Sequence, residues 1–181
     1  MAKRQVEIII LCEGKQDELF VQYFLLKWGF KLRNIRFVTC LPGKESGEAF
    51  VRRNYAIEVN AYRDRKTKGL IAITDADKKS VKQKLTQLRE ELSKNHISEP
   101  KQYEAIAVFI PKRNIETWLH YLKGEQVNEE DKYSKKNPSQ CKLYVEDLAD
   151  RCQQKQKLEE NAPPSLKRAC QEFQRLLPLL N

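Results

Sequence analysis

Four short apolar runs within residues 6–110 constrain the fold of the chain more than any other feature of the sequence. They are Val6–Cys12, Ile35–Leu41, Leu70–Thr74 and Ala105–Ile110. Each run is rich in β-branched side chains and is followed by a polar residue, a glycine or a proline. A short, continuous apolar run is typical of a strand that is buried on both faces, as strands of a parallel sheet are.

Segments with helical periodicity lie between and after these runs. We predict helices over 16–28, 46–66, 81–92, 115–122, 142–154 and 164–177. In the third of these, Ser80 and Gln83 form a capping-box pattern at the helix start. Strands that alternate with helices indicate a parallel sheet with helices on both faces. The predicted fold class is therefore α/β, a three-layer sandwich around a mainly parallel, four-stranded, Rossmann-like sheet with additional C-terminal helices.

The spacing of apolar residues also suggests how the chain is organised. Residues 1–123 hold the strands and are expected to form the α/β domain. Residues 124–141 are polar, with few apolar anchors, and are predicted to form a loop with freedom to move. Residues 142–181 are expected to form a helical extension that packs on the same domain.

Carboxylates stand directly after two of the predicted strands. Glu13 follows the first run, and Asp75 and Asp77 follow the third. The carboxyl ends of parallel strands meet at one edge of a sheet, so these groups are expected to converge there. Converging carboxylates repel one another, and a hard cation such as Mg²⁺ or Mn²⁺, which prefers oxygen ligands, relieves that repulsion. The alternative for Asp77 is a structural role as the cap of the next helix.

Two stretches of the sequence resemble the Toprim domain. They are L-C-E-G-K-Q-D-E-L-F at 11–20 and I-T-D-A-D-K-K-S at 73–80. Topoisomerases, bacterial primases, overcoming-lysogenization-defect nucleases and small stand-alone proteins share that domain. The match falls on Glu13, Gly14, Asp75 and Asp77. The resemblance implies that the three acids bind Mg²⁺, that Glu13 also acts as a general acid or base, and that Gly14 lets the backbone approach a bound phosphate.

Two further acids match Toprim patterns more loosely. Asp17 completes an E-G-x-x-D pattern, and Glu116 lies in P-K-R-N-I-E-T-W-L at 111–119. The second segment resembles one found in nuclease-like Toprim proteins of phage-defence systems. The resemblance implies that both acids help to bind metal. The alternative is that each is a favourable acid in the first turn of a helix, with Asn114 as the cap before Glu116.

Basic residues stand beside these acids. Lys112 is the candidate for neutralising charge on a phosphate in the transition state. Lys78, Lys79 and Arg113, together with the backbone at Gly14, are the candidates for nucleic-acid binding. The alternative for these side chains is a solvated basic surface. His120 lies one helical turn after Glu116, and we expect it to be partly buried with its hydrogen bonds satisfied.

The composition favours a polyanionic partner in a reducing compartment. Lys and Arg total 34 against 25 Asp and Glu, a net charge of +9, which attracts nucleic acid. The five cysteines are scattered and form no C-x-x-C pair, so we predict neither a zinc knuckle nor a disulfide framework, and a cytoplasmic location. No apolar run has the length of a membrane helix, so no membrane partner is expected.

These features predict a Mg²⁺- or Mn²⁺-dependent Toprim nuclease that hydrolyses DNA or RNA, as an effector in a phage-defence or toxin-like system. Because no G-x-x-x-x-G-K-[ST] loop occurs, an ATPase partner would be a separate chain. D-A-D-K-K-S lacks the glycine of D-P-D-x-x-G in the Toprim maturase of 5S ribosomal RNA, which argues against that identity. The main alternative is a non-catalytic Toprim module that binds nucleic acid or regulates a partner. A phospho-acceptor receiver domain and, more distantly, a D-x-D sugar transferase are the others, and a homo-oligomer is compatible with all of them.

Overall fold

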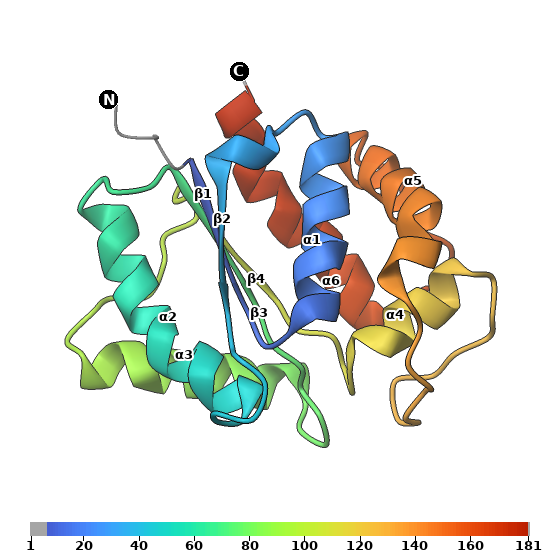
Figure 1. The fold of residues 1–181 in the computed structure, drawn as a ribbon, viewed down its shortest axis with the longest axis horizontal. Helices are drawn as coiled ribbons and strands as arrows, with labels where there is room; N and C mark the ends of the chain where they lie inside the picture. Colours follow the sequence, from blue (N-terminus) through green and yellow to red (C-terminus); the bar gives the residue numbers. More distant parts are fainter. Residues whose placement is uncertain (1–6, 181) are drawn as a thin grey trace.

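A four-stranded parallel sheet forms the centre of the protein, whose computed structural model describes residues 7–180. The strand order is β2-β1-β3-β4, and every neighbouring pair is parallel (Figure 1). The strands are β1 (Ile8–Cys12), β2 (Ile35–Thr39), β3 (Gly69–Ile73) and β4 (Ile106–Phe109). All four predicted strands are therefore present, within one or two residues at their ends. Val6, predicted as the first strand residue, lies outside the described residues.

Helices cover both faces of this sheet, which confirms the predicted α/β class. One face carries α2 (Gly47–Arg63) and α3 (Val81–Lys94). The other face carries α1 (Lys15–Lys27), α4 (Ile115–Leu122), α5 (Lys142–Gln153) and α6 (Pro164–Phe173) (Figure 1). Alternate residues of the buried strands serve the two faces: Ile8 and Ile10 pack toward α1, whereas Ile9 and Leu11 pack toward α2.

One predicted helix boundary is confirmed and another is wrong. Ser80 and Gln83 form the predicted capping box at the start of α3. The prediction of an α-helix to residue 177 is wrong, because α6 ends at Phe173 and the chain continues as the 3-10 helix η3 (Gln174–Leu180). Pro178 has no N–H to complete an α-helical hydrogen bond, which accounts for the change of helix type.

The C-terminal helices contribute to the same core as α1. The ring of Phe173 stacks on Phe24 and lies against Trp28 and Phe109. The Trp28 indole N–H donates to the carbonyl of Ala149 at 2.7 Å. These contacts place α5 and α6 on the sheet rather than beside it.

Hydrogen bonds restrain the loop that the sequence predicts to be free to move. Gln16 Nε2 donates to the Lys136 carbonyl at 2.8 Å, and the Ser165 N–H donates to Glu129 Oε1 at 2.9 Å. The loop then enters a short 3-10 helix, η2 (Pro138–Cys141), before α5. Its path across the protein is therefore fixed by contacts with α1 and α6.

The cysteines correct one expectation from the sequence. Cys152 and Cys170 form a disulfide between α5 and α6, with their Cα atoms 5.2 Å apart, so the prediction of no disulfide is wrong. The spacing alone gave no sign of it, because helix packing brings the two residues together. Cys12, Cys40 and Cys141 are buried free thiols. No helix between residues 7 and 180 is long and apolar enough to cross a membrane.

Candidate functional site at the carboxyl edge of the sheet

The carboxyl ends of β1 and β3 bring Glu13 to the Asp75 segment. Glu13 directly follows β1, and its Oε1 accepts a hydrogen bond from the Asp75 backbone N–H at 2.8 Å. The same oxygen accepts from the Thr74 hydroxyl. Since β1 and β3 are neighbouring parallel strands in register, residues distant in the sequence leave the sheet at the same point.

Asp17 and Glu116 approach this edge from two helices. Asp17 lies in the first turn of α1 and Glu116 in the first turn of α4, and the residues are only 6% and 4% exposed. Asp17 Oδ2 accepts from the Gly14 N–H at 3.2 Å, so the helix-start alternative describes this oxygen correctly. It does not describe the other oxygen, Oδ1, which is buried and has no hydrogen-bond partner.

Electrostatics show that the acids lie close enough to influence one another. Burial raises the pKa of Asp75 well above its ordinary value, and the charges of Asp17, Glu13 and Glu116 raise it further. Burial likewise raises the pKa of Asp17, with Glu13 and Glu116 adding to the effect. Burial also raises the pKa of Glu13, although its hydrogen bonds from Thr74 and Asp75 act in the opposite direction. Carboxylates from β1, α1, β3 and α4 thus share one partly dehydrated site.

The donor set fits the chemistry of a hard divalent cation. Oδ1 of Asp17 and Oδ1 of Asp75 are both buried without a partner, and an unpaired buried carboxylate oxygen is costly. Among residues 7–180, no group of three or more His, Cys, Asp or Glu side chains is arranged so that it could hold a metal ion. Mg²⁺ is usually held by one or two carboxylates, with water and substrate phosphate as its remaining ligands. Two such oxygens would supply only part of the ligands of a cation.

Asp77 is exposed on a turn, and its charge acts on both Glu13 and Asp75. Its backbone φ is +52°, and it forms an isolated bridge with Arg113, whose φ is +75°. The Asp77 N–H donates to the Arg113 carbonyl at 3.1 Å. Left-handed backbone is costly for residues other than glycine, so the bridge holds both turns in a strained form. Asp77 does not cap α3, because Ser80 occupies that position, and the capping alternative for Asp77 is wrong.

Cationic side chains line a hollow beside Asp77. Its volume is about 340 Å³. The lining residues are Asp77, Lys78, Lys79, Arg113, Asn114 and Lys132. Lys78 and Lys79 come from the loop after β3, Arg113 from the turn after β4, and Lys132 from the restrained loop after α4. Lys132 is not among the residues predicted from the sequence, because nothing in a polar loop signals which of its lysines will line a hollow.

The remaining candidates have distinct environments. Lys112 Nζ lies 3.8 Å from Glu130 Oε1, and the residue is not among those that line the hollow. Gly14 borders open space, since a Cβ at this position would have no neighbour within 4 Å. Asn114 stands at the N-terminal cap position of α4, but its side chain makes no capping hydrogen bond, and its buried Oδ1 has no partner. His120 is buried and bonded to Glu125 and to the Ser134 carbonyl, as predicted.

Comparison with known proteins places the chain in a family. A family model described as "Protein of unknown function (DUF3226)" matches residues 7–157. The chain belongs to the DUF3226 family. No curated protein and no solved structure matches it. The matched segment contains every acid of the candidate site, and it ends between α5 and α6.

The structure adds two residues behind Glu13 to the site of this DUF3226 protein. Lys84 on α3 is 2% exposed, its Nζ lies 3.2 Å from Glu48 Oε1, and its charge lowers the pKa of Glu13. Gly47 begins α2 directly against the backbone and Cβ of Glu13. A lysine in a polar helix and a glycine after a turn look ordinary in sequence. Only the packing of α2 and α3 against β1 gives them a role.

Replacing Gly47 by alanine is expected to displace Glu13. The added Cβ would lie 2.6 Å from the Glu13 Cβ and 3.1 Å from its Cα, so the backbone of β1 or α2 must move. We expect Gly47→Ala to lower the free energy of unfolding by about 1–3 kcal/mol, as overpacking does. Urea denaturation measures this. Gly14→Ala is the steric control, because its Cβ meets open space, and an equal loss in both variants would contradict the assignment.

Proposed function

We propose that this DUF3226 protein is a Mg²⁺- or Mn²⁺-dependent phosphodiesterase of the Toprim type that acts on DNA or RNA. The observation that carries the proposal is that Asp17 and Asp75 each have a buried carboxylate oxygen without a hydrogen-bond partner, and that the charge of Asp17 acts on Asp75. The cationic hollow adjoins this site, because Asp77 is one of its lining residues. The positive charges of the hollow would attract the phosphate backbone of a nucleic acid. The joint placement of E-G after β1 and D-x-D after β3 supports the Toprim assignment.

The residues present divide into two roles. Asp75 and Asp17 would hold the cation through their unpartnered oxygens, and water and substrate phosphate would supply its remaining ligands. A bound divalent cation polarises a phosphoryl oxygen and makes a bound water more acidic. Glu13 is the candidate for proton transfer, because burial raises its pKa above the ordinary value of a glutamate, which favours exchange of a proton. The lysines and Arg113 of the hollow would neutralise neighbouring phosphates.

The proposed setting follows from the same features. The excess of basic residues suits a nucleic-acid substrate, and we propose that the protein acts as an effector alongside a separate ATPase chain. The competing function is a non-catalytic module that keeps the acids only to bind a structural Mg²⁺. The two differ in one property, which is whether bound nucleic acid is cut.

A cleavage assay on purified protein tests the proposal. Transfer RNA, ribosomal RNA, and single- and double-stranded DNA are incubated with Mg²⁺, Mn²⁺ or EDTA. We expect cutting with either metal and none with EDTA, and a rate lower by about 100-fold or more in Glu13→Gln. Glu90→Gln, an exposed carboxylate on α3, is the matched control. The assay is repeated with cell extract added, which supplies any missing partner. Binding of nucleic acid without cutting, under both metals and with the extract, would favour the non-catalytic module.

Lys132 is expected to contribute to substrate binding although it is distant from the acids in sequence. Lys132→Ala should weaken nucleic-acid binding by about 3- to 10-fold near physiological salt and reduce the salt dependence of binding by about one ion. Fluorescence anisotropy in EDTA measures this without cleavage. Lys135→Ala removes an exposed lysine of the same loop that does not line the hollow. Equal losses in the two variants would mean that only net charge matters.

A further inference from the structure

A second cavity lies beside β4, and none of the acids of the proposed nuclease site lines it. Its volume is about 110 Å³. Its apolar lining comes from α3 and β4, including Leu85, Leu88, Leu92, Ile106 and Val108. Its polar lining includes Tyr55, Arg89, Arg168, Glu172 and Arg175, from α2, α3, α6 and η3. The cavity therefore has an apolar floor and a rim that carries three arginines.

The α6 side of the cavity is held by hydrogen bonds to the edge strand. Arg168 donates from one terminal nitrogen to the Val108 carbonyl at 2.8 Å. The Val108 N–H donates to Glu172 Oε2 at 3.0 Å. Two side chains of α6 thus occupy the backbone groups that a further strand would use. Hydrogen bonds to β4 therefore hold the Arg168 and Glu172 side chains in place.

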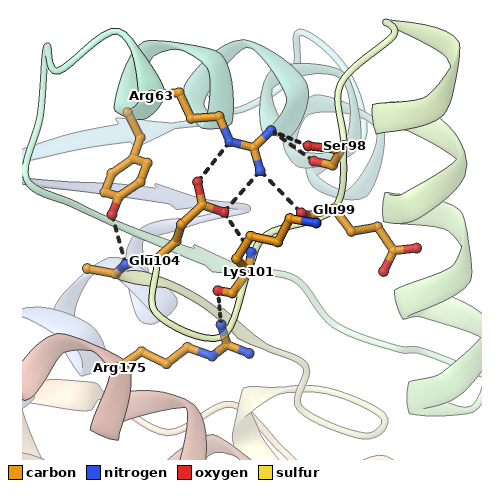
Figure 2. Close-up of polar contacts among 8 residues, drawn as sticks. Arg63, Ser98, Glu99, Lys101, Glu104 and Arg175 are labelled. Carbon is orange, nitrogen blue, oxygen red and sulfur yellow. Dashed lines mark hydrogen bonds and ion pairs between the residues drawn. The ribbon is translucent and has the colours of Figure 1, made fainter.

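The loop between α3 and β4 forms the opposite wall and is also restrained (Figure 2). Arg63 donates to both carboxylate oxygens of Glu104, at 2.9 and 3.0 Å, and to the Ser98 carbonyl at 2.9 Å. Arg175 donates to the Lys101 carbonyl at 3.0 Å, which ties the same loop to η3 (Figure 2). The cavity is therefore bounded on two sides by walls with fixed geometry.

The charges around the cavity do not balance. Glu99 pairs with Arg89 at 3.0 Å, and Glu172 pairs with Arg175 at 3.3 Å. Arg168 is left with a neutral carbonyl and a distant contact of 3.9 Å to Glu172. Burial lowers the pKa of Arg168. The charge of Glu172 acts in the opposite direction, and the charges of Arg175 and Arg89 add to the lowering. A guanidinium in this position gains from a nearby anion.

Tyr55 offers one more donor to such an anion. The residue is 3% exposed and lines the cavity. A tyrosine hydroxyl can donate to an oxygen of a ligand that enters the cavity.

We propose that this cavity binds a small organic monocarboxylate. The carboxylate pairs with Arg168, whose planar guanidinium matches it through two parallel hydrogen bonds, and also accepts from Tyr55. A short apolar tail lies on the leucine floor from α3. The cavity holds several times the ~30 Å³ that one water occupies in the liquid, which is the size of a short-chain acid rather than of a nucleotide. A bound ligand would link α3 to α6.

Calorimetric titration of the full chain tests the proposal. The probes are butyrate, the neutral isostere butyramide, and inorganic phosphate. We expect butyrate to bind saturably in the millimolar range, and butyramide and phosphate to bind at least about fivefold more weakly. Butyrate should also raise the melting temperature.

Variants decide where the ligand binds. Arg168 itself supports β4, so two other changes are informative. Tyr55→Phe removes a proposed donor, and Arg89→Gln removes a positive charge that lines the cavity and acts on Arg168. Each should weaken butyrate binding by about three- to tenfold. Arg53 is an exposed residue of α2 that pairs with Glu45, outside the cavity. Arg53→Gln should leave butyrate binding unchanged. The proposal is overturned if butyrate shows no saturation up to about 50 mM, if phosphate or butyramide binds as tightly, or if all variants bind alike. Nuclease activity is not needed for any of these results.

Discussion

Asp75→Asn is expected to make the metal-free protein more stable while abolishing its activity. The substitution removes one charge from a site where burial and three neighbouring acids already raise the pKa of Asp75. We expect the free energy of unfolding without metal to rise by about 1 kcal/mol. We also expect Mg²⁺ to lose its stabilising effect, and cleavage to fall by about 1000-fold. Thermal melts with EDTA and with Mg²⁺, beside the cleavage assay, measure all three.

The pH dependence of stability gives the same prediction a second readout. Because Asp75, Asp17 and Glu13 have raised pKa values in the folded state, the folded chain binds more protons than the unfolded chain just above the ordinary carboxylate range. The free energy of unfolding without metal should therefore decrease as pH rises through that window, and level off above the raised pKa values.

Comparing Asp75→Asn with a control variant shows whether the decrease in the free energy of unfolding with pH comes from the acids of the site. Asp75→Asn should flatten the decrease, whereas Glu90→Gln, on the exposed side of α3, should keep it. If Asp75→Asn destabilised the metal-free protein, the acids would be stabilising one another rather than competing, and the proposed cation site would lose its basis.

Phe173→Ala is expected to cause the largest loss of stability from a single change in the C-terminal helices. The ring is 1% exposed and lies between Phe24, at a centroid distance of 3.4 Å, and Phe109, at 4.0 Å. Truncation removes this buried surface and leaves a cavity, at a cost of about 3–5 kcal/mol. Urea denaturation should show one transition at a lower midpoint, because α6 shares its core with the sheet.

The control for this change lies on the neighbouring helix. Leu143 on α5 is 75% exposed, and Leu143→Ala should change the free energy of unfolding by less than about 0.5 kcal/mol. Two separate transitions in the wild type, or a small effect of Phe173→Ala, would mean that α6 is not part of the central core.

Much of this fold can be predicted from the sequence, because strands and helix starts are marked by residues that are close together in the chain. Buried strands such as Ile8–Cys12 appear as continuous apolar runs, and Ser80 and Gln83 mark a helix start through side chains three residues apart. The convergence of Glu13 with Asp75 follows from topology alone, since parallel strands end at one edge.

The remaining features depend on packing between elements, which sequence patterns do not encode. Lys132, Lys84 and Gly47 reach the site only because a loop and two helices cross it. The Cys152–Cys170 disulfide likewise depends on how α5 meets α6. The outward position of Asp77 results from a left-handed turn that a D-x-D pattern does not specify.

The bonds from Arg168 and Glu172 to Val108 bear on how this protein should be shortened for experiments. A fragment that stops at the end of the family match, residue 157, would lack both side chains and would expose the backbone of the outermost strand. Exposed strand backbone recruits other chains, so such a fragment should self-associate even if its acids were intact. Work on the isolated family region therefore needs the last helices, which the family description does not include.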